Sequence, residues 1–162
     1  MQIVRWIWAA PGVFLVHDAE EIATVASWMP NHRVELPAAV QPFAIVTTRQ
    51  FSFAVIVLFL GLLAATVHAV PRARVGTRSL PFLLMVGALV ANGVTHLAQA
   101  AVFRGYTPGL LTAVLLVIPY GIGLGEELRN SGLASRRTWL AMVALGALLQ
   151  VPIIIGILAL VR

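Results

Sequence analysis

The chain has 162 residues, of which 60% are hydrophobic and only 10% are charged, and its mean hydropathy is +0.94. Soluble domains carry about 25% charged residues, so this composition excludes an ordinary soluble domain and predicts a chain that lies mostly within a membrane. The lack of cysteine excludes disulfides and thiolate metal sites, and the net charge of +5 does not indicate nucleic acid, because the arginines fall mostly at the ends of apolar segments.

Five apolar segments are long enough to cross a hydrocarbon layer of about 30 Å as helices. They predict an all-α, polytopic membrane helical bundle that forms a single integral membrane domain over residues 1–162. Pro11-Gly12 interrupts the first segment, so this helix is either kinked there or preceded by an interfacial segment. The predicted spans cover approximately residues 3–28, 50–70, 80–103, 108–129 and 138–161.

The first span contains HDAEE, which places ionisable side chains inside an apolar helix. His17, Glu20 and Glu21 are spaced i, i+3 and i+4 and share one face, with Asp18 at its edge. Each carboxylate near a bilayer centre costs roughly 2.5–3.5 kcal/mol, so protonation, pairing with arginine or a bound cation must compensate it. Pairing would need an interfacial arginine to reach inward, which favours the cation.

The third span carries a second polar stripe, formed by Asn92 and His96 at i, i+4. At 1.5 Å per residue, Asn92 and His17 both fall near the middle of their spans. His96 and the two glutamates lie roughly 7 Å toward the same side of the membrane. We therefore expect one site between the first and third spans.

The turn RGYTPG leads into the fourth span. Thr107 is expected to cap this helix and Pro108 to occupy its first position. Tyr106 lies above the third span, where it can act as a lid or hydrogen-bond donor for the site, or as an interfacial tyrosine.

Imidazoles and carboxylates together are typical ligands of zinc or non-haem iron, as one ion or two. Of Glu20 and Glu21, one can ligate while the other serves as general base on a metal-bound water. The predicted site comprises the catalytic residues Glu20, Glu21 and Tyr106 and the metal ligands His17, Glu20, Glu21, Asn92 and His96.

Other polar and small residues lie toward the opposite side. His68, Glu126 and Glu127 form, at most, a second cluster there. Gly121 and Gly125 have the GxxxG spacing that favours close helix packing. Arginine distribution predicts that the amino terminus is inside, because seven arginines then fall on the inner side and four on the outer side.

The motif residues resemble those of the HXXEE-domain family of small bacterial integral membrane proteins. His17-Asp18-Ala19-Glu20-Glu21 matches the signature, and the resemblance extends to Asn92 and His96 and to the YTPG turn, covering residues 13–120. It implies a membrane-embedded enzyme, in a bacterial cytoplasmic membrane, whose motif residues form the site. It does not specify a reaction.

The leading hypothesis is a membrane-embedded, metal-dependent enzyme acting on a lipidic or membrane-partitioned substrate. Hydrolysis is slightly favoured over di-iron-type oxidation, because the ligand set lacks one carboxylate of a full di-iron site. One alternative is a cation or proton pathway that uses the same His-Glu cluster, and another is a structural partner subunit with an ion site. The expected partners are the membrane and a lipid or hydrophobic small molecule, with homo-oligomerisation left open.

Overall fold

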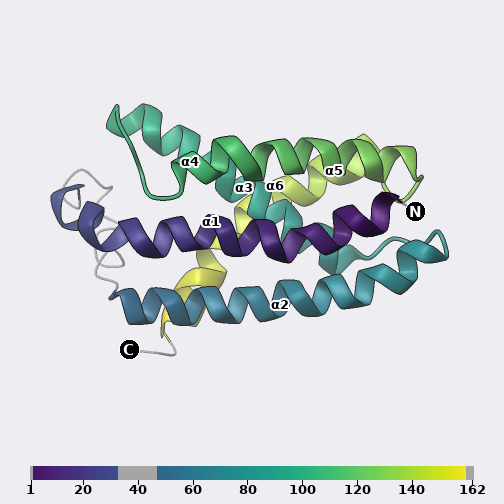
Figure 1. Ribbon diagram of the computed structural model, residues 1–162, viewed down its shortest axis with the longest axis horizontal. Coiled ribbons are helices and arrows are strands. Elements are labelled where there is room, and N and C mark those ends of the chain that lie inside the picture. The colour runs from purple at the N-terminus through teal and green to yellow at the C-terminus, as the bar shows by residue number, and fades with distance from the viewer. Residues whose placement is uncertain (1, 33–46, 160–162) are drawn as a thin grey trace.

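The structure is a computed structural model that describes residues 2–32 and 47–159, and all regular structure in this part of the chain is helical. The predicted all-α fold is confirmed (Figure 1). The elements are α1 (Gln2–His32), α2 (Thr48–Arg74), α3 (Leu80–Phe103), α4 (Leu110–Thr112), the π-helical turn η3 (Ala113–Val117), α5 (Ile118–Asn130) and α6 (Arg136–Ala159).

Within residues 2–32 and 47–159, four helical segments are long and apolar enough to cross a membrane, and they correspond to the second to fifth predicted spans. The first helix, α1, is longer than any of them but carries Arg5 and the HDAEE residues, and it is not among the four. It runs between α2 and the α4–α5 segment (Figure 1). The four segments are Thr48–Arg74, Leu80–Phe103, Leu110–Asn130 and Arg136–Ile157.

Helix α1 continues through Pro11, so the residues before this proline are not a separate interfacial element. Ile7 is buried in the bundle. The ring of Trp6 packs on that of Tyr120 with 5.8 Å between centroids, and the Tyr120 hydroxyl donates to the Trp6 carbonyl over 2.8 Å. The first turns of α1 are therefore held against α5 by packing and by a hydrogen bond.

Helices α3 and α6 cross with their backbones in contact. A Cβ atom added to Gly87 would lie 2.5 Å from the carbonyl oxygen of Met142, and one added to Gly146 would meet the backbone of Ala88. Such close approach is possible only where the side chain is a hydrogen. This contact fixes α3, which carries Asn92 and His96, within the bundle.

The predicted close packing at GxxxG is also observed. A Cβ on Gly121 would lie 2.5 Å from a methyl carbon of Val90 in α3, and one on Gly125 would lie 2.6 Å from the indole nitrogen of Trp139 in α6. The two glycines thus let α5 approach both neighbours.

The segment after the YTPG turn begins later than predicted. Helix α4 starts at Leu110, and its N-cap is Gly109, at φ 83°. The predicted cap, Thr107, is wrong: its buried hydroxyl donates instead to the His96 carbonyl over 3.4 Å. The π-helical turn η3 lies just before Pro119, which has no N–H to donate to the preceding turn.

Candidate functional site

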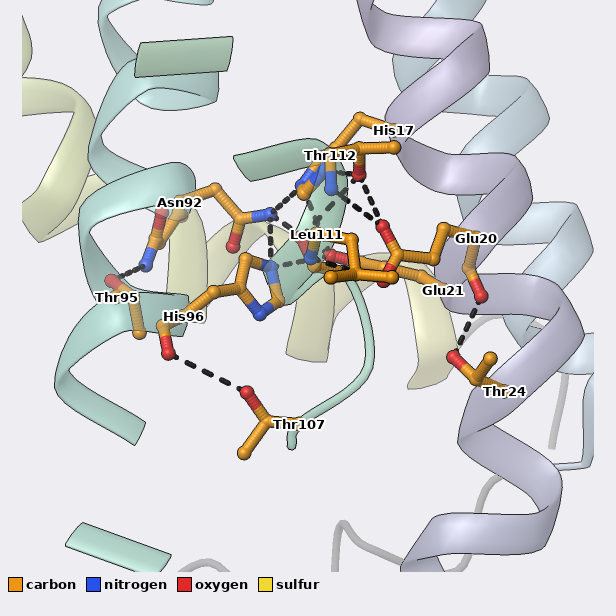
Figure 2. A network of polar contacts seen from close by, with 12 residues as sticks. His17, Glu20, Glu21, Thr24, Asn92, Thr95, His96, Thr107, Leu111 and Thr112 are labelled. Carbon is orange, nitrogen blue, oxygen red and sulfur yellow. Dashed lines mark hydrogen bonds and ion pairs between the residues drawn. The ribbon is translucent and has the colours of Figure 1, made fainter. Parts of the chain in front are cut away.

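The two polar stripes meet inside the bundle, as their predicted depths required. His17 and Glu21 come from α1, and Asn92 and His96 come from α3 (Figure 2). The side chains are largely removed from solvent: His17 is 0% exposed, His96 7% and Glu21 9%.

Three of these residues converge on one point. His96 Nε2 lies 2.6 Å from Glu21 Oε1, and His17 Nε2 lies 3.3 Å from the same oxygen. Each residue offers one ligand atom, and these atoms all lie within 4.8 Å of one another. His17, Glu21 and His96, called the triad below, are therefore placed where they could hold a metal ion.

The side-chain amide of Asn92 occupies the middle of the triad. Its Nδ2 atom lies 3.1 Å from His17 Nε2, from Glu21 Oε1 and from His96 Nε2. An amide nitrogen has only two hydrogens, so it cannot donate to all three. The short contact between His96 and Glu21 places a proton on His96 Nε2, so this nitrogen cannot accept from Asn92. The amide therefore donates to Glu21 and to His17, and His17 Nε2 carries a lone pair.

Thr112 fixes the orientation of the His17 ring. Its hydroxyl lies 2.8 Å from His17 Nδ1 and donates to Glu20 Oε2 over 2.6 Å. Since the single hydroxyl proton goes to the carboxylate, the oxygen accepts the N–H of His17 Nδ1. This arrangement directs the Nε2 lone pair into the triad, as the outer hydrogen bond of a metal-binding histidine does.

Glu20 lies beside the triad and not within it. Its carboxylate accepts from the backbone N–H groups of Leu111 (3.2 Å) and Thr112 (2.8 Å) at the start of α4, and from the Tyr106 hydroxyl (2.7 Å). The amino-terminal end of a helix stabilises negative charge. The charge of Glu20 is therefore compensated by a helix terminus and by hydroxyl groups, which the side-chain pattern did not reveal.

Tyr106 hydrogen-bonds to Glu20 and, within the described residues, makes no hydrogen bond to the triad. Its backbone carbonyl accepts from the Trp28 indole over 2.8 Å, and its side chain is 39% exposed. Partial burial, and then the hydrogen bond to Glu20, raise the pKa of Tyr106. The hydroxyl thus donates to Glu20, which is one of the roles expected for Tyr106 from the sequence.

Gly109 places the backbone of the YTPG turn directly against the triad. It adopts φ +83°, and a Cβ atom there would lie 3.0 Å from Glu21 Cγ, His17 Cε1 and His96 Cε1. Glycine is needed both for the left-handed backbone and for the close approach. The turn thus closes one side of the site with backbone atoms.

Asp18 lies outside the triad. It lines a cavity of about 120 Å³ together with Glu21 and Asn92, and it is 7% exposed. The rest of the lining is apolar apart from Gln150: Phe14, Phe51, Ala54, Val55, Leu58, Leu62, Met85, Ala88, Leu89, Ile153 and Ile154. The triad therefore borders an apolar cavity.

The second predicted cluster is not assembled in the described residues. His68 Nδ1 lies 2.9 Å from the Ser79 hydroxyl, and Glu126 is exposed. Within residues 2–32 and 47–159, the triad is the one group of histidine and acidic side chains close enough to hold a metal ion.

Comparison with known proteins assigns the chain to a family that is defined by its motif. No curated protein and no solved structure gives a match. The family described as "Protein of unknown function with HXXEE motif" matches residues 8–124. This range includes the triad, Asn92, the YTPG turn and Thr112, and the chain belongs to that family.

Proposed function

We propose that the protein is a membrane-embedded, metal-dependent enzyme in which the triad holds a divalent cation. One observation supports this above all: three potential ligand atoms, from two helices, lie 3.1 Å from the single point occupied by Asn92 Nδ2. Zinc–nitrogen bonds are about 2.0–2.1 Å long, so the ligands need to close by about 1 Å. Asn92 would move aside or turn its Oδ1 atom toward the cation.

Two imidazoles and one carboxylate favour a mononuclear catalytic site. This set binds zinc in metallohydrolases and iron in non-haem oxygenases, and in both cases leaves coordination positions for water or substrate. Because Glu20 is engaged by α4 and stands outside the triad, the second carboxylate of a di-iron pair is lacking. Hydrolysis is therefore favoured over di-iron-type oxidation, with the cation supplying Lewis-acid activation.

The surrounding residues are suited to holding the two imidazoles. Thr112 and Glu20 keep the proton of His17 on Nδ1. His96 Nδ1 is buried and has no hydrogen-bond partner in the described part of the chain. The proton of His96 can move to Nδ1 at the loss of only its hydrogen bond to Glu21, and Nε2 is then free to bind a metal that Glu21 also binds.

The proposed location is within a membrane, with α1 as a fifth crossing. Four helices have the length and apolarity of spans, and α1 is packed between α2 and α5. The buried His17, Asp18 and Glu21 of α1 then face the bundle interior, where such residues occur in membrane proteins. The excess of arginine at one end favours an inner amino terminus, and an apolar cavity beside the triad favours a membrane-soluble substrate.

No comparable observation favours a cation or proton pathway. Such a pathway would benefit from a track between the triad and His68, but the His68 ring contacts Ser79. The alternative of a structural partner subunit would use the same triad as an ion site. An activity measurement distinguishes it from an enzyme.

The test is metal analysis of protein purified in mild detergent and loaded with zinc or ferrous iron. We expect one equivalent in the wild type and loss in His17→Ala, Glu21→Gln and His96→Ala. His68→Ala is the matched control, because it removes an exposed imidazole. Folded wild-type protein that binds no metal, or histidine variants that keep it, would overturn the proposal.

A further inference from the structure

The cavity beside the triad contains two polar groups without full partners. Asp18 is 7% exposed, and within the described residues its carboxyl group accepts only from its own backbone amide and lies near the carboxylate of Glu21. Gln150 lines the same cavity from α6, and its Oε1 atom is buried without a hydrogen-bond partner among residues 2–32 and 47–159. Unpaired polar atoms in an apolar surrounding are costly, so they point to a ligand that completes them.

The orientation of the Gln150 amide follows from its neighbour. The Thr95 hydroxyl donates to the Ala91 carbonyl over 3.0 Å, so its oxygen must accept the contact of 3.4 Å from Gln150. The atom facing Thr95 is therefore Nε2, which leaves Oε1 as the unpaired acceptor.

Both groups thus offer an acceptor oxygen, which a carboxyl group keeps whether or not it is protonated. The described residues of the cavity lining also include Glu21, and none of them is an arginine, lysine or histidine. A fatty acid would bring its carboxylate next to that of Glu21 and would be disfavoured. A hydroxyl or amino group would instead donate to the free acceptors.

We propose that this cavity binds a membrane-soluble molecule with an apolar body and a hydroxyl or amino head group. The volume of about 120 Å³ is similar to that of an apolar cavity that holds benzene, about 150 Å³. It therefore accommodates a small apolar segment beside the head group.

Glu21 and Asn92 belong both to the cavity lining and to the site. A head group held by Asp18 is thereby brought next to the triad. The identification of the bound molecule as the substrate rests on the proposed function. The binding of the molecule in the cavity does not.

The experiment uses the full chain in lipid nanodiscs with a chelator present. The probe is a short-chain alkanol carrying a mid-chain diazirine, compared with its methyl ether, which keeps the oxygen but cannot donate. After photolysis, the labelled residues are located by mass spectrometry. We expect the alkanol to label the cavity-lining parts of α2 and α6 roughly threefold to tenfold more than the ether, the ratio that one hydrogen bond gives.

Variants separate the head-group contact from general partitioning into apolar space. Asp18→Leu and Gln150→Met remove the acceptors with similar side-chain size, and each should reduce alkanol labelling to the level of the ether. Glu126→Gln, at an exposed acid on α5, should leave the difference intact. Circular dichroism shows whether each variant is folded.

Equal labelling by alkanol and ether in the wild type would overturn the inference, and so would labelling outside the cavity. If Asp18→Leu is misfolded, Gln150→Met alone decides. The chelator makes the labelling independent of metal. Selective cavity labelling, together with no metal in the metal analysis described above, would refute the proposed function alone. Metal binding without selective labelling would refute this inference alone.

Discussion

Thr112 holds the imidazole of His17 although 95 positions separate them in the chain, with 2.8 Å between the hydroxyl oxygen and Nδ1. The same hydroxyl donates to Glu20, so a carboxylate, a hydroxyl and an imidazole form one chain of hydrogen bonds (Figure 2). The two glutamates of HDAEE thus differ in position: Glu21 meets both imidazoles, while Glu20 orients one of them through Thr112.

Replacing Thr112 with valine should weaken metal binding about 10- to 100-fold, which is the usual effect of removing the partner of a metal-binding histidine. Valine has nearly the same shape but cannot accept from His17. Thr112→Ser keeps the hydroxyl and should bind nearly as well as the wild type. Competition with a metal-indicator dye measures the affinity. Equal affinities for the valine and serine variants would contradict the role of the Thr112 hydroxyl in orienting His17.

Gly109→Ala should destabilise the protein and impair the triad together. The left-handed backbone costs a non-glycine residue about 1–2 kcal/mol, and the new methyl group would press on the three triad residues at 3.0 Å. Gly105→Ala is the control, because a Cβ there meets only the Phe103 carbonyl at 3.8 Å. Thermal unfolding and metal titration of both variants test this, and a Gly109→Ala protein as stable as Gly105→Ala would refute it.

Tyr106→Phe should lower the free energy of unfolding by about 1 kcal/mol, a modest value for a half-exposed hydrogen bond to a carboxylate. Because the pKa of Tyr106 is raised in the fold, its contribution is complete below pH about 10, the unfolded value, and is lost as pH rises through the folded value. Denaturant unfolding of both proteins at neutral and strongly alkaline pH measures the difference.

A double-mutant cycle identifies the partner of Tyr106. Combining Tyr106→Phe with Glu20→Gln should cost less than the sum of the two single changes, because they affect one hydrogen bond. Tyr120→Phe, whose hydroxyl bonds to the Trp6 carbonyl, should be additive with Glu20→Gln. Additivity in both cycles would contradict the assigned contact.

Gly87→Ala should separate α3 from α6. Its Cβ atom would lie 2.5 Å from the Met142 carbonyl oxygen, and backbone atoms cannot yield as a flexible side chain can, so we expect a loss of about 1–3 kcal/mol. Gly12→Ala meets nothing within 4 Å and should be neutral or stabilising by about 0.5–1 kcal/mol. Unfolding in a mixed-micelle titration compares the two, and equal stability would show that the helices are not in close contact.

Much of the fold could be predicted because apolar length and spacing specify helices directly. The range predicted for the third span, residues 80–103, coincides with α3. The start of α4 could not be placed, since Thr107 and Pro108 have the composition of a helix start while the chain needs Gly109 for a turn against the triad. The π-helical turn before Pro119 was also missed, because a proline predicts a disturbance but not its form.

The site was predictable as far as helical spacing and depth determine it. Those two rules brought His17, Glu21, Asn92 and His96 together. They could not identify Thr112, whose hydroxyl stands alone in an apolar segment and gains its role from a neighbouring helix. Nor could they assign Glu20 to the start of α4, because its partners there include backbone N–H groups that no side-chain pattern records.

The YTPG turn and α4 join the site from far along the chain, and this has a consequence for biosynthesis. Asn92 bonds to Glu21 across 71 positions and Thr112 bonds to Glu20 across 92. Contacts of such long sequence separation form late. The HDAEE residues must therefore wait for their partners from α3 and α4 until about two thirds of the chain has been synthesised. Until then, Glu20 and Glu21 lack the hydroxyl, amide and backbone N–H groups that donate to them in the folded chain, and water must supply those hydrogen bonds.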